Sequence, residues 1–225
     1  MAKAALVTGG SSGIGLAIAR MLRDEGHDLT LAARQEEPLR AAAAELSAHA
    51  VTTDVSREED CARVVDAHRE RYGRLDVLVC SAGVGIAARI EELQTKHWDL
   101  QLDVNLRGAF LVTRFALPLL KESHGLVVNL SSIAGTSAAT GLAAYGAAKA
   151  ALISFTRSLN AELADDGVRA TALCPGFVDT PMAAWAGMRS DEMIQPEDCA
   201  EVVRALLRLS PRARVPQVVI ERLGA

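Results

Sequence analysis

The sequence predicts an α/β fold, in which one doubly wound domain places helices on both faces of a seven-stranded, mainly parallel sheet. Short apolar runs, many of them β-branched, alternate along the 225 residues with longer segments of helical periodicity. The apolar runs are hydrophobic on both of their faces, which is typical of strands inside a parallel sheet. No repeat, low-complexity linker or shift in composition divides the chain, so residues 1–225 are expected to form a single domain.

The alternation begins with a buried strand over 4–9 and, after a glycine-rich turn, a helix over 13–26. Gly26 is expected to end this helix, because glycine readily adopts the left-handed conformation found at helix C-termini. A second strand over 28–33 and a helical stretch over 35–48 follow.

A third strand is expected over 50–54 and a fourth over 75–83, with a helix between them that runs through Arg71. Ser56 and Glu59 have the spacing of a capping box, in which each side chain bonds the backbone N–H of the other residue. This pair is therefore expected to open the helix.

Two long helical segments, 95–121 and the alanine-rich 143–164, flank a fifth strand over 125–132. The pattern is completed by three elements: a strand over 168–175, a helix that Pro196 and Glu197 open and that runs to Leu209, and a strand over 216–221.

Composition and charge argue against several classes of function. Lys and Arg number 24 against 28 Asp and Glu, a net charge of −4, and the charges are scattered, so nucleic acid and membrane surfaces are not expected partners. The N-terminus has no signal-peptide pattern, and the most apolar window, 135–155, falls short of a membrane span. The cysteines form no CxxC and the histidines no HExxH, so neither disulfides nor a metal site is indicated. We expect a soluble, cytoplasmic protein.

A glycine-rich turn, TGGSSGIG, joins the first strand to the first helix. Its glycines, Gly9, Gly13 and Gly15, allow positive φ and a close approach of the backbone to a ligand. The helix start offers free N–H groups and the positive end of its dipole, which suit a pyrophosphate. An ordinary tight turn is the alternative, but the position after the first strand of a βαβ unit favours dinucleotide binding.

Tyr145 precedes Lys149 by four residues in the alanine-rich helix, so the two side chains share one helix face. Taken alone, the pair favours the interpretation that these are two neighbours with no joint function.

Five stretches, TGGSSGIG, CSAG, NLSS, YGAAK and PGFVDT, occur in the order and positions typical of the short-chain dehydrogenase/reductase family, and the chain resembles that family over about 4–182. The resemblance implies a Rossmann-like fold, with a cofactor half at about 1–130 and a catalytic and substrate half at about 131–225. It also implies hydride transfer between a nicotinamide cofactor and a carbonyl or alcohol.

The resemblance implies roles for four residues. Tyr145 would be the general acid in reduction and the general base in oxidation. Lys149 would lower the pKa of the Tyr145 phenol and hold the nicotinamide ribose. Ser132 would bond the substrate oxygen; spacing alone leaves Ser131 open, and the family pattern selects the second serine. Asn105 matches the member that kinks a helix and holds a water for proton relay, with a buried structural amide as the alternative.

The remaining cofactor contacts are also implied by the resemblance. Asp54 would meet the adenine ring, although a turn-forming Asp is the alternative, and Thr180 would bond the carboxamide. The family's usual NAG is here Ser81-Ala82-Gly83, for which we expect a modest loss of rigidity near the adenine. The expected cofactor-binding set is Gly9, Ser11, Ser12, Gly13, Ile14, Gly15, Arg34, Asp54, Val55, Ser81, Ala82, Gly83, Tyr145, Lys149, Pro175, Gly176, Val178 and Thr180.

The end of the second strand predicts a preference for NADP(H) over NAD(H). Ala32 and Ala33 leave empty the place where a carboxylate bonds the ribose of NAD, and Arg34 follows at once. A guanidinium there suits a 2′-phosphate. The alternative is a surface Arg that pairs with Glu36 or Glu37. Ser12 stands where many relatives that use NADP carry a second basic residue.

The substrate is expected to be a small or medium hydrophobic ketone, aldehyde or secondary alcohol. The segment 182–194 should cover the pocket, and it offers apolar side chains that could equally pack the loop down: Met182, Trp185, Met188 and Met193.

A catalytically weak dinucleotide-binding regulator or scaffold is the alternative function. A methyltransferase is a further alternative, but it leaves the YxxxK helix and PGFVDT unexplained.

The segments 95–121 and 143–164 are apolar on more than one face, and in the family they form a dimer interface, so a homodimer or homotetramer is expected. The chain ends soon after its seventh strand, which puts the family's tetramer contact in doubt.

Overall fold

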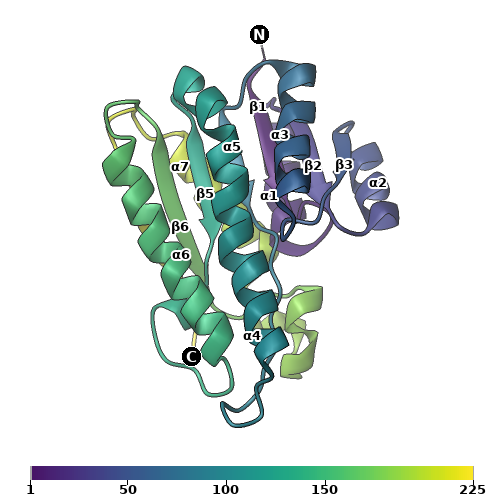
Figure 1. Ribbon diagram of the computed structural model, residues 1–225, viewed down its shortest axis with the longest axis vertical. Helices are drawn as coiled ribbons and strands as arrows, with labels where there is room; N and C mark the ends of the chain where they lie inside the picture. The colour runs from purple at the N-terminus through teal and green to yellow at the C-terminus, as the bar shows by residue number, and fades with distance from the viewer. Residues whose placement is uncertain (1, 225) are drawn as a thin grey trace.

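The computed structural model describes residues 2–224, apart from the side chains at 185 and 186, and it confirms the predicted fold. Seven strands form one sheet in the order β3-β2-β1-β4-β5-β6-β7, and every neighbouring pair is parallel (Figure 1). The strands are β1 (Ala4–Thr8), β2 (Asp28–Ala33), β3 (His49–Thr52), β4 (Val77–Cys80), β5 (Leu126–Leu130), β6 (Arg169–Pro175) and β7 (Gln217–Ile220).

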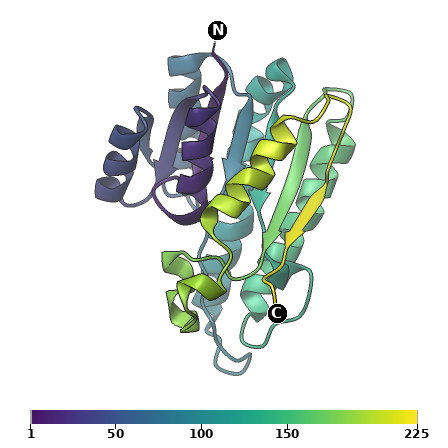
Figure 2. The same ribbon diagram turned by 180° about the vertical axis from the view of Figure 1, so that it is seen from behind.

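Helices cover both faces of this sheet. Figure 1 shows α3 (Glu58–Tyr72), α5 (Gly108–Ser123) and α6 (Ala143–Glu162) in front of the strands, with α4 (Thr95–Leu102) continuing below α5. Seen from behind in Figure 2, α1 (Gly13–Asp24) and α7 (Pro196–Leu207) cross the opposite face. The helix α2 (Glu36–Glu45) buries Leu39, Ala42 and Ala43 in the same core as α1.

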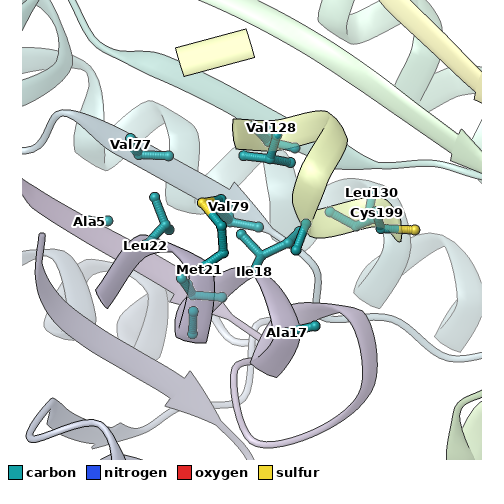
Figure 3. Packing of buried hydrophobic residues seen from close by; sticks show 14 of the residues in the cluster. Ala5, Ala17, Ile18, Met21, Leu22, Val77, Val79, Val128, Leu130 and Cys199 are labelled. Carbon is teal, nitrogen blue, oxygen red and sulfur yellow. The ribbon is translucent and has the colours of Figure 1, made fainter. Parts of the chain in front are cut away.

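Each face of the sheet carries its own hydrophobic core. Between the strands and α1 and α7, Ile18 and Leu22 meet Val79 and Val128 (Figure 3). A second core, on the other face, packs α3, α5 and α6 against the sheet. Burial on both faces explains why the central strands β1, β4 and β5 are buried at every position.

The strand order reverses direction between β1 and β4, which lie side by side although β2 and β3 come between them in sequence. Loops that leave two such strands run to opposite faces, and the gap between them is where doubly wound folds hold ligands. The loops that follow the strands gather at the lower end of Figure 1, together with the short helices η3 (Pro181–Ala186) and η4 (Ser190–Glu192).

The predicted helix over 95–121 is interrupted. After α4 the chain forms a five-residue π-helical turn, η1 (Asp103–Arg107), before α5 resumes the α-helical pattern and extends to Ser123. The backbone N–H of Gly108 bonds the carbonyl of Asp103, five residues back. Sequence periodicity does not reveal this single wide turn, because the apolar pattern continues through it.

The capping box predicted at Ser56 and Glu59 is wrong. The backbone N–H and the hydroxyl of Ser56 both donate to a carboxylate oxygen of Asp54, at 3.0 and 2.7 Å, and α3 begins only at Glu58. Asp54 is only two residues from Ser56, so its carboxylate accepts both bonds locally and holds Ser56 in a turn before the helix. Asp60 in turn bonds the backbone N–H of Asp54 at 2.9 Å.

The other predicted elements have the expected type, and β2 has the predicted bounds. The predicted strand over 75–83 is the most overextended, since β4 covers only Val77–Cys80. Among the described residues no helix is long and apolar enough to cross a membrane.

His68, on α3, is a buried hydrogen-bonding link between that helix and the sheet. Its Nδ1 lies 2.8 Å from the hydroxyl of Thr30, and its Nε2 lies 2.9 Å from the carbonyl of Arg74. A carbonyl only accepts, so Nε2 carries the proton and Nδ1 accepts from Thr30. Burial lowers the pKa of His68 from 6.5 to about 4.

We therefore expect His68 to make folding sensitive to mild acid. Because its pKa is lower in the folded state, the unfolded chain takes up the proton first, and stability present above about pH 6.5 is lost toward pH 4. His68→Gln can repeat both hydrogen bonds but does not titrate. In urea unfolding, the wild type should lose about 1 kcal/mol more than the variant for each pH unit below 6. Stability curves of the two proteins that stay parallel from pH 7 to pH 5 would contradict this.

Candidate functional site

Tyr145 and Lys149 lie on successive turns at the start of α6. The Lys149 side chain is buried, with its Nζ 5.5 Å from the centroid of the Tyr145 ring. Its ammonium donates a hydrogen bond of 2.6 Å to the main-chain carbonyl of Leu130, the last residue of β5. The helix and the end of β5 therefore meet at this point.

The electrostatics of the pair differ from the expectation that Lys149 lowers the pKa of the phenol. Burial raises the pKa of Tyr145, and a hydrogen bond with Ser132 lowers it in part. Burial also lowers the pKa of Lys149 to about 8. The group that contacts the phenol is the hydroxyl of Ser132, while the ammonium is bonded to Leu130, and this geometry explains the difference.

The two serines after β5 have different partners. Ser132 is extended, its oxygen accepts a bond of 3.2 Å from the N–H of Ala134, and it contacts Tyr145. Ser131 instead donates to the main-chain carbonyl of Lys149 at 2.8 Å. Of the two candidates, Ser132 is thus the one whose hydroxyl meets the phenol.

Asn105 lies in the π-helical turn η1 and is 1% exposed. Its Oδ1 accepts from the backbone N–H of Val84 at 3.0 Å, and its Nδ2 donates to the carbonyl of Val84 at 2.8 Å. The amide therefore fastens the loop that follows β4, which is the structural alternative. A Cβ on Gly83 would lie 2.9 Å from Oδ1 of Asn105 and 3.7 Å from Nζ of Lys149, so Asn105 lies directly behind the site.

The glycine turn brings backbone against backbone. Gly9 and Gly13 have φ values of +66° and +52°, which favour glycine. A Cβ on Gly15 would lie 2.3 Å from the carbonyl oxygen of Gly9, so no other residue fits there without a shift. No side-chain hydrogen bond from Ser12 caps α1, whose first N–H groups face this turn.

The glycine turn also lies close to the segment that follows β6. A Cβ on Gly13 would be 3.1 Å from the side chain of Thr180, which belongs to the segment after β6. Positive φ, a helix start and missing side chains form a cradle of the kind that a dinucleotide pyrophosphate fills.

The end of β2 lies beside both the glycine turn and the loop after β3. The N–H of Gly10 bonds the carbonyl of Ala32 at 3.3 Å, and the N–H of Thr53 bonds that of Ala33 at 3.0 Å. Arg34 is exposed there and has no ion pair within residues 2–224. Glu36, one of its two expected alternative partners, pairs with Arg40 at 2.5 Å.

Two residues expected at the adenine have structural roles. The carboxylate of Asp54 holds the turn at Ser56, which is the turn-forming alternative. The side chain of Val55 is buried, and a Cβ on Gly108 would lie 2.9 Å from it. Only the backbone of Val55 is therefore available for an adenine contact.

A cavity of about 220 Å³ lies at the carboxyl end of the sheet. Of the expected residues, those that line it are Ile14, Ser81, Gly83, Ser132, Tyr145, Lys149, Pro175, Gly176, Val178 and Thr180. Those that do not are Gly9, Ser11, Ser12, Gly13, Gly15, Arg34, Asp54, Val55, Ala82 and Asn105. Most of the second group lies around the β1 and β2 ends, where the adenosine half of a dinucleotide would extend.

Fewer residues of the segment 182–194 line the cavity than expected. Met182 lines the cavity, whereas Met188 and Met193 do not, and the side chain of Trp185 lies outside the described residues. A bridge between Val178 and Ile194 closes the base of this loop. Met188 and Met193 lie in the part of the loop that leads back to that base, so their apolar character does not indicate a pocket wall.

Sequence reasoning missed the opposite wall. It consists of Leu130 at the end of β5 and of small or apolar residues that follow β4, β5 and β6: Gly85, Ala87, Ile133, Ala134, Ser137, Ala139, Leu142, Phe177 and Ala183. A backbone bond from Ala88 to Gly141, 2.9 Å long, joins the first two loops. The run of Ala, Gly and Ser residues after β5 is the sequence feature that could have indicated this part of the cavity lining.

Comparison with known proteins gives consistent results. A sequence model of a family described as short chain dehydrogenase matches residues 3–190. An uncharacterized oxidoreductase of Staphylococcus aureus strain USA300 is 35% identical over 222 residues, 97% of this chain and 96% of the relative. An alcohol dehydrogenase from the archaeon Thermococcus sibiricus, complexed with 5-hydroxy-NADP, superposes with a TM-score of 0.93 at 32% identity, covering 99% of this chain and 97% of that one. An actinorhodin polyketide ketoreductase variant with NADPH has a TM-score of 0.90 at 35% identity, covering 97% and 95%.

Proposed function

The chain belongs to the short-chain dehydrogenase/reductase family and is an NAD(P)-dependent oxidoreductase, and we propose that it acts on hydrophobic carbonyl compounds or alcohols with Tyr145 as general acid and base. The observation that carries the proposal is that Ser132, Tyr145 and Lys149, which come from the end of β5 and the start of α6, line one cavity. A regulator or scaffold without turnover has no need of this arrangement.

When bound, the nicotinamide supplies the hydride in reduction or accepts it in oxidation. Ser132 hydrogen-bonds the substrate oxygen, and Tyr145 delivers a proton to that oxygen as negative charge develops on it. In oxidation the phenolate takes the proton back, and before substrate binds, the hydroxyl of Ser132 stabilises this phenolate. Lys149 holds the nicotinamide ribose, and its Nζ lies 5.5 Å from the centroid of the Tyr145 ring. Asn105 acts as a positioning residue, because its amide is bonded to Val84.

The cofactor is assigned to the half of the chain at about 1–130, with the catalytic and substrate half at about 131–225. The cradle at Gly9, Gly13 and Gly15 suits the pyrophosphate, and Thr180 beside Gly13 suits the carboxamide end. An exposed Arg34 with no ion pair within the described chain favours NADP(H), because a guanidinium is free to bond a 2′-phosphate in a forked contact. The NADP compounds bound to the two similar structures agree with this choice.

The lining of the cavity favours an uncharged, hydrophobic substrate. Tyr145 and Lys149 are the ionisable residues that line it in the described structure, and no Arg is present to pair with a carboxylate or phosphate. The substrate wall combines small residues such as Ala87 and Ala139 with the larger Phe177 and Met182. An apolar site with few polar groups selects a small or medium hydrophobic ketone, aldehyde or secondary alcohol.

The proposal extends to a homo-oligomer formed through α4, α5 and α6. Phe110 is 42% exposed on α5, and its ring meets that of Phe155 on α6 edge to face at 6.1 Å. An aromatic pair across two helices, with Phe110 exposed and Phe155 half-buried, is a favourable centre for a face shared with a second copy.

The chemical assignment is tested with Tyr145→Phe, assayed by NADPH absorbance on a panel of uncharged ketones and their carboxylate analogues. Turnover should fall by about 10²–10⁴, the contribution of general acid catalysis, while NADPH affinity stays near the wild-type value. The chain has two tyrosines, and Tyr72→Phe, which alters the other one far from the cavity, is the matched control that should retain activity. Residual activity of Tyr145→Phe above about a tenth, or a preference for the carboxylates, contradicts the assignment.

The cofactor assignment is tested by fluorescence titration with NADPH and NADH. Arg34→Ala should weaken NADPH binding by about ten- to a hundredfold, as expected for the loss of charge-assisted hydrogen bonds, and leave NADH binding nearly unchanged. Ala33→Asp should turn the preference toward NADH. Arg69→Ala, which removes an exposed arginine on α3 that pairs with Asp66, should change neither affinity. Equal affinity of the wild type for both cofactors would show that Arg34 is only a surface charge.

Light scattering at micromolar concentration tests the assembly. The wild type should have at least the mass of a dimer, and Phe110→Glu should shift it toward the monomer, because it introduces a charge into an apolar contact. Leu209→Glu places the same charge at a residue that is 38% exposed after α7, on the other face of the sheet, and should leave the mass unchanged. A monomeric wild type rules the interface out.

A further inference from the structure

Two consecutive serines after β5 contact the same helix at two points. Ser132 meets the phenol of Tyr145, whereas Ser131 donates a hydrogen bond of 2.8 Å to the main-chain oxygen of Lys149. Both members of the second contact are buried, with Ser131 and Lys149 each 4% exposed. The mechanism above uses Ser132 and gives Ser131 no role.

The carbonyl of Lys149 lies within α6, where it accepts the regular helical hydrogen bond with one lone pair. The hydroxyl of Ser131 uses its second lone pair, so the contact adds to the helix and replaces nothing in it. Tyr145 and Lys149 are about 6 Å apart along the helix axis, whereas the serines are adjacent on the strand. Two contacts at different heights fix both the rotation of α6 and its position along β5.

The backbones are in close contact around these two points. A Cβ on Gly135 would lie 2.7 Å from the carbonyl carbon of Lys149, and one on Gly146 would lie 2.8 Å from the oxygen of Ala134. Packing therefore sets how closely the strand end approaches the helix. Packing of these two glycines against backbone atoms does not prevent sliding, however, whereas a directional bond such as that of Ser131 does.

We propose that Ser131 is a positioning residue: its hydrogen bond to the carbonyl of Lys149 holds α6 in the register at which the phenol of Tyr145 reaches the hydroxyl of Ser132. The importance of Ser131 for catalysis rests on the proposed function. The contact between Ser132 and Tyr145 that it maintains, however, is present in the protein without cofactor or substrate. Without the hydroxyl of Ser131 the contact between Ser132 and Tyr145 lengthens. A phenolate with a weaker donor has a higher pKa.

The experiment measures the pKa of the Tyr145 phenol directly. In a Tyr72→Phe background Tyr145 is the sole tyrosine, so ring-fluorinated tyrosine gives one fluorine NMR signal whose titration midpoint is the pKa of that phenol. Within the described residues Lys149 is the charged group that contacts the ring, and it is present in every variant. Ser131→Ala should raise the midpoint by about one pH unit. Ser131→Cys, a weaker donor, should give an intermediate value, and Ser131→Thr should restore the wild-type value.

Ser123→Ala is the matched control. Ser123 also donates from its hydroxyl to a main-chain carbonyl, that of Leu75, at the opposite end of the sheet. It should lose thermal stability to a similar degree without moving the midpoint. In the enzyme assay Ser131→Ala should lower kcat by about tenfold with little change in KM, and shift the rise of alcohol oxidation to higher pH.

An unchanged midpoint in Ser131→Ala, with a stability loss like that of Ser123→Ala, overturns the proposal and leaves Ser131 a satisfied buried hydroxyl. If Ser131→Ala does not fold, an unchanged midpoint in Ser131→Cys has the same meaning. A raised midpoint in a protein that turns over no carbonyl compound supports the positioning role and refutes the proposed function, so the two failures are distinguishable.

Discussion

All seven strands run in the same direction, and this constraint determines where everything else lies. Each strand ends at the same edge of the sheet, so residues that follow β1, β4, β5 and β6 meet although up to about 170 positions separate them in sequence. The glycine turn after β1, Gly83 after β4, Ser132 after β5 and Thr180 after β6 all reach this edge. The reversal of strand order between β1 and β4 leaves the room that a dinucleotide needs.

Within that edge the geometry depends on backbone contacts that exclude side chains. Gly15 lies against the carbonyl of Gly9, Gly135 against Lys149, and Gly146 against Ala134. In each case a Cβ would lie less than 3.0 Å from a backbone atom. At these positions a side chain larger than that of glycine is excluded because its Cβ would clash with the backbone. The precision of the site therefore comes from backbone rigidity together with a few hydrogen bonds from serine and asparagine side chains.

Burial sets the protonation equilibria of the site. The Lys149 side chain is almost inaccessible and has a pKa lowered to about 8, and the phenol of Tyr145 has a raised pKa because it too is buried. The hydroxyl of Ser132 is the group that opposes this effect on Tyr145 in the structure. An apolar pocket thus favours a neutral phenol, which is the form that donates a proton in carbonyl reduction.

The sequence by itself determined the α/β fold, the order of strands and helices, the glycine turn and the pairing of Tyr145 with Lys149, because each depends on local periodicity or on spacing within one element. The turn at Ser56 is local too, because its acceptor, Asp54, is two residues away. Tertiary structure alone decided two features. The π-helical turn at Asn105 accompanies a bond to Val84, 21 residues away. The division of labour between Ser131 and Ser132 depends on which neighbour each hydroxyl meets across the contact of β5 with α6. Such contacts are set by the packing of distant segments, and no local pattern of residues encodes them.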